Sequence, residues 1–326
     1  MPQIHTVTLN PAIDRILYLD RFQPDVTNRL RSCVDGIGGK GTHVSINLQL
    51  LGLANQALGI VHGENGNRII QLLKNCDVTV KFQHYPVQNS RMNYLLIEDN
   101  GSCTCLSSKG VPLSETDITS FIDFLRRELH DGDYLVLSGD ASNCPDAFVY
   151  NTIMEACQDK HPKIFLDTSG DTLKKCIEAK PFLIKPNKDE LAELCGRTLS
   201  TEKDLICAME EVSQAGIPNI AVSLGGKGSV VRTEEGVYRV YPAKVNVCNT
   251  IGCGDCFLSG LIYGFYHNLP IVQSLKLATA ISGSCAESSI SVGFDPERVE
   301  KLYGQIQIET QKALQTTYTK NTKLQT

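Results

Sequence analysis

The chain lacks several features that would each have set its class. It has no apolar run approaching the roughly 20 residues that a helix needs to cross a bilayer. It has no excess of positive charge, since its net charge is −5 and its pI is about 5.8, so a nucleic acid or an anionic membrane would find no broad basic face. Its first residues, Met1–His5, have neither the basic region nor the apolar core of a secretory signal, and we therefore expect a cytoplasmic protein.

A dense cysteine framework is also missing. The 13 cysteines are spread from Cys33 to Cys285, which does not fit the disulfide scaffold of a small secreted domain. One C-x-x-C occurs, at Cys253–Cys256, and without a second such pair or a spaced pair of histidines a closed zinc site is not favoured. We expect reduced thiols.

Length and composition predict one large domain. With 326 residues, 42% of them apolar, the chain can bury a substantial core. We expect a single α/β domain over residues 1–315 with a small appendage, followed by a polar C-terminal tail at residues 316–326. The sequence contains no internal repeat and no linker of low complexity.

Short runs rich in β-forming residues alternate with helix-like segments over most of the chain. The predicted strands are Ile4–Leu9, Ala57–Val61, Tyr134–Ser138, Lys163–Asp167, Phe182–Lys185 and Ile220–Leu224. The predicted helices are Thr42–Leu51, Gly66–Asn75, Ser114–Leu129, Asp146–Gln158, Lys188–Cys195, Thr201–Ala215, Cys256–His267 and Ile271–Glu287. This alternation predicts a doubly wound fold, in which helices cover both faces of a mainly parallel sheet. Gly260 and Gly264 would let their helix approach the sheet closely.

Two segments, residues 13–36 and 78–107, break the alternation. They are extended and have no helices between their apolar runs. Glu98–Ser102 between two such runs predicts a hairpin, because its Asn-Gly pair tolerates the positive φ angles of a tight turn. We expect the two segments to form a small antiparallel sheet outside the main one.

The most informative motif is Asn249–Asp255, with the sequence Asn-Thr-Ile-Gly-Cys-Gly-Asp, immediately before the predicted helix Cys256–His267. N–H groups at a helix start lack internal acceptors, and that end of the helix is partly positive. The backbone of residues 252–254 could therefore bind phosphoryl oxygens beside the Asp255 carboxylate. Two other interpretations stay open: Asp255 as a simple helix cap, and Cys253 with Cys256 as a redox pair.

Gly38–Gly41, with the sequence Gly-Gly-Lys-Gly, is a second candidate for close approach of the backbone to a ligand, and Lys40 would supply a cation. With Gly36 it matches the dinucleotide fingerprint G-x-G-x-x-G, but Arg29–Asp35 is too charged to be the buried strand that this fingerprint needs. A glycine turn with a solvated lysine is the alternative. No G-x-x-x-x-G-K-[ST] occurs, which excludes a P-loop.

Polar residues also follow two later strands. Leu183–Leu191 runs from a strand into a helix, so its polar residues lie at the carboxyl end of the strand, where open α/β sheets bind ligands. Asn187 and Glu190 there are either a structural capping box or neighbours of a hydrated magnesium ion. Val222–Ser229 is either a turn or a loop over nucleotide phosphates.

Together these motifs resemble the ribokinase-like, PfkB-type carbohydrate kinases over nearly the whole chain, and in particular the branch that phosphorylates sugar phosphates, 1-phosphofructokinase and tagatose-6-phosphate kinase. The matching segments, in the order of that branch, are Thr8–Asp14, Asn28-Arg29, Gly38–Gly41, Ser90–Asn93, Lys185–Leu191, Ser223–Gly225 and Asn249–Asp255. The resemblance implies a doubly wound ribokinase-like domain with a β-sheet lid that often pairs into a homodimer. It also implies ATP and Mg²⁺ as cofactors.

The resemblance assigns roles to individual residues. Asp255 would be the catalytic base, and the amides of Gly252, Cys253 and Gly254 the anion hole. The sugar phosphate would be bound by Asp14, Gly38, Gly39, Lys40, His43, Arg91 and Asn93. The nucleotide would lie along Lys185, Asn187, Ser223, Gly225, Gly228 and Asn249, and the metal near Asn187 and Glu190.

Four places depart from the branch's usual pattern. His43 replaces an asparagine, Cys253 an alanine, Gly139–Cys144 a Ser-Leu-Pro-Pro-Gly loop, and Ser107–Val111 a stretch that normally ends in Gly-Pro. The expected reaction is transfer of the ATP γ-phosphoryl group to a primary hydroxyl of a ketohexose phosphate, either fructose 1-phosphate or tagatose 6-phosphate. A kinase of an unphosphorylated sugar or nucleoside, and a catalytically idle relative that binds a nucleotide or a sugar, are the alternatives.

Overall fold

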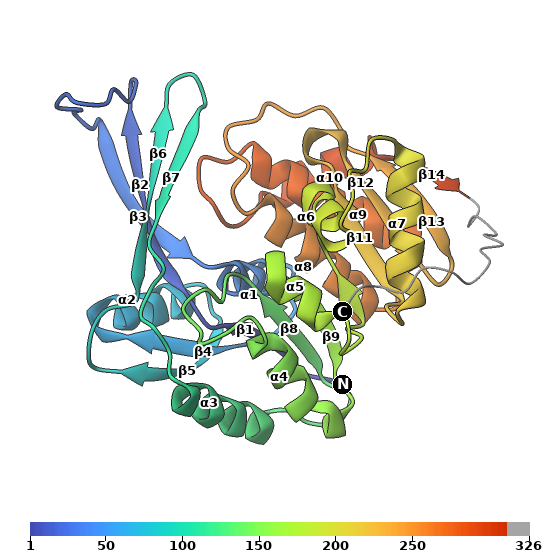
Figure 1. The fold of residues 1–326 in the computed structure, drawn as a ribbon. Helices are drawn as coiled ribbons and strands as arrows, with labels where there is room; N and C mark the ends of the chain where they lie inside the picture. Colours follow the sequence, from blue (N-terminus) through green and yellow to red (C-terminus); the bar gives the residue numbers. More distant parts are fainter. Residues whose placement is uncertain (312–326) are drawn as a thin grey trace.

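The structure is a computed structural model that describes residues 1–311. Ten strands form the main sheet (Figure 1). In sheet order they are β14 (Gln307–Gln311), β13 (Gly236–Tyr241), β12 (Ser229–Thr233), β11 (Asn219–Ser223), β10 (Leu183–Ile184), β9 (Lys163–Asp167), β8 (Tyr134–Ser138), β1 (Ile4–Thr8), β4 (Gln56–His62) and β5 (Thr79–Tyr85). All pairs from β11 to β5 are parallel, and those from β11 to β14 are antiparallel.

Helices cover both faces of this sheet, which confirms the predicted doubly wound fold. One face packs against α3 (Glu115–Glu128), α4 (Val149–Ala156), α5 (Gly170–Cys176), α6 (Lys188–Leu194) and α7 (Glu202–Gln214). The other packs against α1 (Lys40–Leu50), α8 (Cys253–Tyr266), α9 (Ile271–Ala286) and α10 (Pro296–Tyr303). Strand β8 contributes side chains to the hydrophobic cores on both faces. Leu135 and Leu137 pack in the core under α3–α7, and Tyr134 and Val136 pack in the core under α1 and α8–α10.

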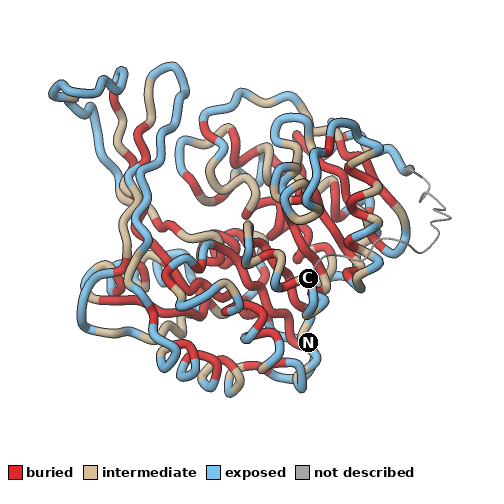
Figure 2. Tube along the Cα trace, in the orientation of Figure 1, coloured by how far each residue is buried: buried red, intermediate tan, exposed pale blue. Residues whose placement is uncertain are grey.

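A third, smaller core lies where the main sheet meets the lid. It contains Ile69 and Leu73 of α2 (Gly63–Lys74), Val61 of β4, and Ile13 and Ile37 of the lid strands. Buried residues follow the sheet and its helices, whereas the far ends of the lid hairpins are exposed (Figure 2). The lid is therefore anchored at its base and projects from the body.

The small sheet consists of two hairpins, in the order β3 (Ser32–Gly38), β2 (Ala12–Leu19), β6 (Arg91–Glu98) and β7 (Cys103–Ser107). Each hairpin is antiparallel, as predicted, but the central pair β2–β6 runs parallel. The reason is that each of these strands follows a parallel strand of the main sheet, β1 or β5, and continues outward from it.

The second lid segment is shorter than the predicted 78–107. Residues 79–85 form β5, which pairs in parallel with β4 at the edge of the main sheet. An edge strand is half exposed and therefore has the alternating polar pattern that led to its assignment to the lid. In this second segment, the strands of the lid begin at Arg91.

Two helices, α5 and α10, were not predicted from the sequence. Helix α5 has only 7 residues, too few for an apolar period to emerge. Helix α10 has 8, but Asp295 caps it and Pro296 stands at its first position, which is a recognisable start signal. The glycines of α8 also have a different neighbour from the one expected. A Cβ on Gly260 would lie 2.4 Å from Ala278 of α9, so this glycine admits a helix rather than the sheet.

Within residues 1–311, none of the helices is long and apolar enough to cross a bilayer. The predicted tail at residues 316–326 lies outside the described residues. The single-domain boundary at residue 315 lies outside them too and stays a prediction.

Candidate active site

The predicted ligand-binding residues converge at the carboxyl ends of the parallel strands, beside the start of α8. This helix begins at Cys253, three residues before the predicted start, with Gly252 as its N-cap at φ 79°. Asp255 therefore lies inside the first turn and is not a residue preceding the helix. A Cβ at Gly252 would lie 1.9 Å from the Ser291 carbonyl oxygen, so only glycine fits this sharp entry.

Asn249 braces the loop that leads into α8. Its side chain is buried; Nδ2 donates to the carbonyl oxygens of Ser288 and Ile290 at 3.0 and 3.2 Å, and Oδ1 accepts from the Ile251 amide at 2.6 Å. The structure thus ties this predicted nucleotide residue to the loop after α9. Its direct contact with a nucleotide stays a prediction.

The proposed base is paired with a buried histidine of α1. Asp255 Oδ2 lies 2.8 Å from His43 Nδ1, and the side chains of these residues are only 7% and 4% exposed, respectively. His43 Nε2 lies 2.9 Å from the Ile37 carbonyl oxygen. Because a carbonyl oxygen only accepts, Nε2 carries a proton, and Nδ1 can donate to Asp255 only when the ring is cationic.

The surroundings of His43 favour this cationic form. Burial alone would lower the pKa of His43, but the Asp255 carboxylate, assisted by Asp14 and the Ile37 carbonyl, holds it above its ordinary value of 6.5. His43 was predicted to contact the sugar; the structure instead directs both ring nitrogens to protein partners. Its effect on a substrate would therefore act through Asp255.

Asp14 of β2 faces the same space from the lid. It is buried, and its Oδ1 accepts from Asn93 Nδ2 at 2.7 Å. Burial raises the pKa of Asp14, while His43, Asn93 and Arg91 oppose that rise. A Cβ on Gly38 would lie 2.0 Å from Asp14 Oδ1, so the glycine at position 38 makes room for this carboxylate.

Two lysines share one buried carboxylate, Asp167, at the end of β9. Lys40 Nζ lies 3.1 Å from Oδ1 and Lys185 Nζ lies 3.1 Å from Oδ2. Burial would raise the pKa of Asp167, but Lys185 and Lys40 hold it below its ordinary value. The three groups leave one net positive charge, and Lys185 Nζ would lie 3.3 Å from a Cβ at Gly254 in the first turn of α8.

Sequence reasoning missed Asp167, although a signal was present. The predicted strand Lys163–Asp167 ends in an acid directly after an apolar run, at the ligand-binding edge of the sheet. The structure also commits Lys40, predicted as a cation for the sugar phosphate, to this acid, and Asp167 correspondingly raises the pKa of Lys40.

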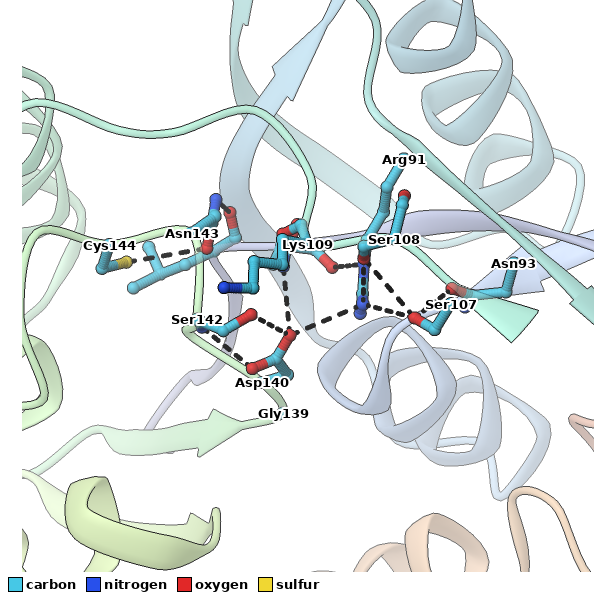
Figure 3. Close-up of polar contacts among 12 residues, drawn as sticks. Arg91, Asn93, Ser107, Ser108, Lys109, Gly139, Asp140, Ser142, Asn143 and Cys144 are labelled. Atoms are coloured by element: carbon cyan, nitrogen blue, oxygen red, sulfur yellow. Dashed lines mark hydrogen bonds and ion pairs between the residues drawn. The ribbon is translucent and has the colours of Figure 1, made fainter. Parts of the chain in front are cut away.

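Arg91 of β6 lies in a polar cluster formed by the two loops that depart from the usual pattern (Figure 3). Its Nε donates to the Asn10 carbonyl oxygen at 3.0 Å, and its Nη1 lies 3.1 Å from Ser107 Oγ and 3.5 Å from Asp140 Oδ2. Asp140, which follows β8, was not predicted as a site residue. It is the acid that faces Arg91.

Three of the six predicted nucleotide residues share a cavity beside the carboxyl ends of β10 and β11. This cavity has a volume of about 460 Å³ and is lined by Asn187, Ser223 and Gly225. The start of α6, at Lys188 and Asp189, and the start of α7 also line it. Gly225, at φ 58°, has open space at its Cβ position and can admit a ligand. Gly228 differs: a Cβ there would lie 2.1 Å from the Val240 carbonyl oxygen, so packing against β13 requires this glycine.

Asn187 and Glu190 form the capping box that the sequence offered as their structural interpretation. Asn187 Oδ1 accepts from the Glu190 amide at 2.9 Å, and Glu190 Oε2 accepts from the Asn187 amide at 2.8 Å. Both side chains still have free lone pairs. Within residues 1–311, histidine, cysteine and acidic side chains do not gather in the groups of three that would chelate a metal directly.

Comparison with known proteins identifies the family. A sequence model described as "pfkB family carbohydrate kinase" matches residues 7–297. The chain belongs to the pfkB family of carbohydrate kinases. The predicted resemblance, and with it the prediction of a carbohydrate kinase, is confirmed.

Individual pfkB-family relatives match over almost their full length. The chain is 31% identical to the 1-phosphofructokinase of Bacillus subtilis over 305 residues, which cover 94% of this chain and 99% of the relative. It is 30% identical to the 1-phosphofructokinase of Vibrio cholerae over 307 residues, covering 94% and 96%. The crystal structure of Escherichia coli phosphofructokinase-2 in complex with potassium is 22% identical, with a TM-score of 0.87 over 94% of this chain and 99% of that one, and shares the fold.

The redox interpretation of the C-x-x-C finds no support in this pfkB-family chain. All 13 cysteines are free thiols, and Cys256 is buried. Contact with Cys285 and burial raise the pKa of the Cys253 thiol, whereas a redox-active thiol at a helix start needs a lowered pKa. The Cys253 backbone amide lies 3.4 Å from the Thr250 carbonyl oxygen, so a phosphoryl oxygen at the anion site would compete with this long hydrogen bond.

We predict that the pairing of His43 with Asp255 makes stability depend on pH. The pKa of His43 is higher in the folded than in the unfolded chain, so the folded state favours the cationic ring. The contribution of this ring to the free energy of unfolding is complete below about pH 6.5 and is lost as pH rises through the raised pKa. In urea unfolding at a series of pH values, the loss of unfolding free energy in His43→Asn should therefore be largest at low pH and shrink as pH rises.

His161→Asn is the matched control, because that ring is 80% exposed. A cost of His43→Asn that is the same at every pH would contradict a cationic ring beside Asp255.

Proposed function

We propose that this chain transfers the γ-phosphoryl group of ATP to a primary hydroxyl of a ketohexose phosphate. The observation that carries the proposal is the position of the Asp255 carboxylate in the first turn of α8, beside the backbone amides with which that helix begins. The named relatives are 1-phosphofructokinases, so fructose 1-phosphate is the leading substrate. Tagatose 6-phosphate, predicted as an equal candidate, comes second.

In this proposal Asp255 orients the acceptor hydroxyl and takes its proton as the new bond to phosphorus forms. The amides of Gly252, Cys253 and Gly254 donate to the phosphoryl oxygens, since the start of a helix carries partial positive charge. Phosphoryl transfer passes through a loose state with charge spread over the equatorial oxygens, so fixed donors around them account for most of the acceleration.

The lysine pair adds positive charge to the same place. Lys185 lies beside the first turn of α8, and Asp167 holds it there together with Lys40. An acid buried between two lysines fixes both ammonium groups and still leaves one net positive charge. Lys185 would then contact the transferred phosphoryl group, and Lys40 would hold Asp167 in place.

Magnesium fits the donors on the nucleotide side. Asn187 and Glu190 offer amide and carboxylate oxygens, the ligand types that Mg²⁺ accepts, and an ion that keeps several waters needs few protein ligands. When bound with ATP, Mg²⁺ supplies positive charge to the β- and γ-phosphates. Asn187 and Glu190 would hold its water shell, while Ser223 and Gly225 line the adjoining cavity.

On the acceptor side, Asp14 and Asn93 would bind sugar hydroxyls. Their mutual hydrogen bond fixes both side chains in the lid strands. Gly39, at φ 110°, lies just before α1, and a Cβ there would crowd Thr8 and Pro11. Packing against Asp14, Thr8 and Pro11 thus accounts for glycine at positions 38 and 39, and we retain the approach of their backbone to the sugar as part of the proposal.

We predict that Asp255→Asn lowers turnover by about 10²–10⁴, the usual scale for a positioned general base. The amide is isosteric and can still accept from His43, so the fold and ATP binding should persist. Steady-state kinetics measures the first effect and titration calorimetry with ATP the second. Near-normal turnover would remove Asp255 as the base.

The proposed substrate is tested with a panel of acceptors. ADP release is measured with fructose 1-phosphate, tagatose 6-phosphate, fructose 6-phosphate, fructose and tagatose, with and without Mg²⁺. We expect the highest kcat/KM with fructose 1-phosphate and a requirement for Mg²⁺. Activity on free sugars alone would overturn the phosphorylated substrate, and activity on none of them would favour a catalytically idle relative.

We further propose that two copies associate through their lids. Tyr94 and Leu106, neighbours on β6 and β7, are 40% and 54% exposed. They lie on the face opposite Asn93, because successive side chains of a strand alternate. Exposed apolar groups clustered on one face are typical of an interaction surface.

For this association we predict that Leu106→Lys gives a monomer, since a charge would be left unpaired in an apolar contact. Light scattering after size-exclusion chromatography measures the mass. Thr119→Lys, an exposed position on α3, is the control and should remain a dimer. A monomeric wild-type chain would contradict association through the lid.

A further inference from the structure

The loop after β8 places a fixed carboxylate opposite the arginine that the sugar phosphate is expected to meet. Asp140 Oδ1 accepts from the Ser142 amide at 2.9 Å, and Oδ2 accepts from Ser142 Oγ at 2.8 Å and from Asn10 Nδ2 at 3.2 Å. Figure 3 shows this carboxylate directed at Arg91 from the strand-end loop. Three donors from the protein thus anchor Asp140 before Arg91 is counted.

Arg91 is equally fixed. Its side chain is 9% exposed, and it donates to the carbonyl oxygens of Asn10 and Ser108 and to the Ser107 hydroxyl. The Nη1–Oδ2 distance of 3.5 Å makes its contact with Asp140 an ion pair rather than a close hydrogen bond. The two opposite charges are therefore held face to face by separate sets of bonds.

The position of this pair relates it to the acceptor site. Arg91 and Asn93 lie on one strand, and β2–β6 pairing sets Asn93 beside Asp14. Asp14 interacts electrostatically with both His43 and Asp255. Residues two apart on a strand point the same way, so Arg91 lies on the face of the lid that carries Asn93 and Asp14.

We propose that Asp140 determines how strongly the site prefers a phosphorylated sugar over a free sugar. Its anchored carboxylate neutralises the positive charge of Arg91, which would otherwise attract the phosphate of the substrate. The proposal rests on the proposed function, transfer to a ketohexose phosphate. A phosphate dianion bound at Arg91 would lie next to the Asp140 carboxylate. Like charges at short range repel each other, so Asp140 would weaken the binding of that phosphate. A neutral hydroxyl can donate to the same carboxylate, so Asp140 narrows the preference for phosphorylated over free sugar.

The neighbouring loop does not cancel this effect. The group of Lys109 that joins the cluster is its carbonyl oxygen, which accepts from Asn10 Nδ2 at 2.8 Å. Asn143 Nδ2 donates to the carbonyl oxygens of Leu9 and Val111, each at 3.2 Å, and so secures the loop that carries Asp140. The Asp140 side chain is 44% exposed, so its hydrogen bonds rather than burial hold the carboxylate in this position.

The test is Asp140→Asn, which keeps the shape and most hydrogen bonds while removing the charge, with Asp140→Ser as a second, smaller replacement. We expect KM for fructose 1-phosphate to fall about tenfold in both variants, with the change in KM rather than kcat. KM for free fructose should stay the same or rise. The ratio of the two kcat/KM values should therefore increase about tenfold.

Binding of inorganic phosphate, followed by titration calorimetry at constant ionic strength, gives a readout that needs no activity. Both variants should bind it more tightly than the wild-type chain. Asp131→Asn is the matched control, because it removes one exposed acid before β8, at the opposite edge of the sheet, and should leave both readouts unchanged.

The outcomes separate the two proposals. An unchanged substrate ratio and unchanged phosphate binding in both variants would overturn the role of Asp140, even if the wild-type chain phosphorylates fructose 1-phosphate. No activity on any sugar phosphate would overturn the proposed function. In that case, tighter binding of inorganic phosphate by the variants would still support Asp140 as the group that opposes a phosphate. Equal phosphate binding by the variants and the wild-type chain would overturn that role of Asp140.

Discussion

The sharp entry into α8 is the constraint on which the rest of the site depends. Gly252 adopts a left-handed conformation against the Ser291 carbonyl, and Asn249 ties the same loop to the segment after α9. This entry places Asp255 in the first turn, where its carboxylate meets the buried ring of His43. The partly positive start of the helix and the His43 ring both lie beside this buried carboxylate. The contact with His43 thus fixes the direction of the carboxylate that we propose as the base.

The same logic of paired charges recurs around the site. Asp167 holds two lysines, Asp255 holds His43, and Asp140 faces Arg91. An isolated buried charge would be costly, so each cation at the strand ends is fixed by an acid. The Lys40–Asp167–Lys185 group keeps a net positive charge near the phosphoryl-transfer position, whereas the Arg91–Asp140 pair keeps none. The net positive charge therefore belongs to the lysine group and not to the arginine pair.

The sequence predicted the architecture well because its signals are local. Alternating β-rich and helical segments indicated the doubly wound sheet, and glycine-rich turns indicated where α1 and α8 begin. The predictions that failed depend on tertiary context: β5 has an edge strand's pattern and was assigned to the lid, and the glycines of α8 face α9 rather than the sheet. The pairing of His43 with Asp255 spans 212 positions in the chain, and no local pattern encodes it. Asp167 had a signal, an acid ending a buried strand, but its two lysine partners come from elsewhere in the fold.

Two departures from the family pattern, His43 and the loop that carries Asp140, lie near the proposed acceptor site. His43 replaces a neutral asparagine, and the loop with Asp140 replaces a Ser-Leu-Pro-Pro-Gly segment that has no charged side chain. His43 acts on Asp255, because both its nitrogens are engaged away from the sugar. Asp140 faces Arg91, and through it would act on the phosphate of the proposed substrate. In the proposed mechanism, one change affects Asp255, the proposed base, and the other affects Arg91, the proposed contact of the acceptor. A pfkB-family kinase can alter its acceptor in this way without rebuilding its phosphoryl-transfer centre, because the acceptor's far end and the reacting hydroxyl contact different elements: β6 and the loop after β8 on one side, and α8 on the other.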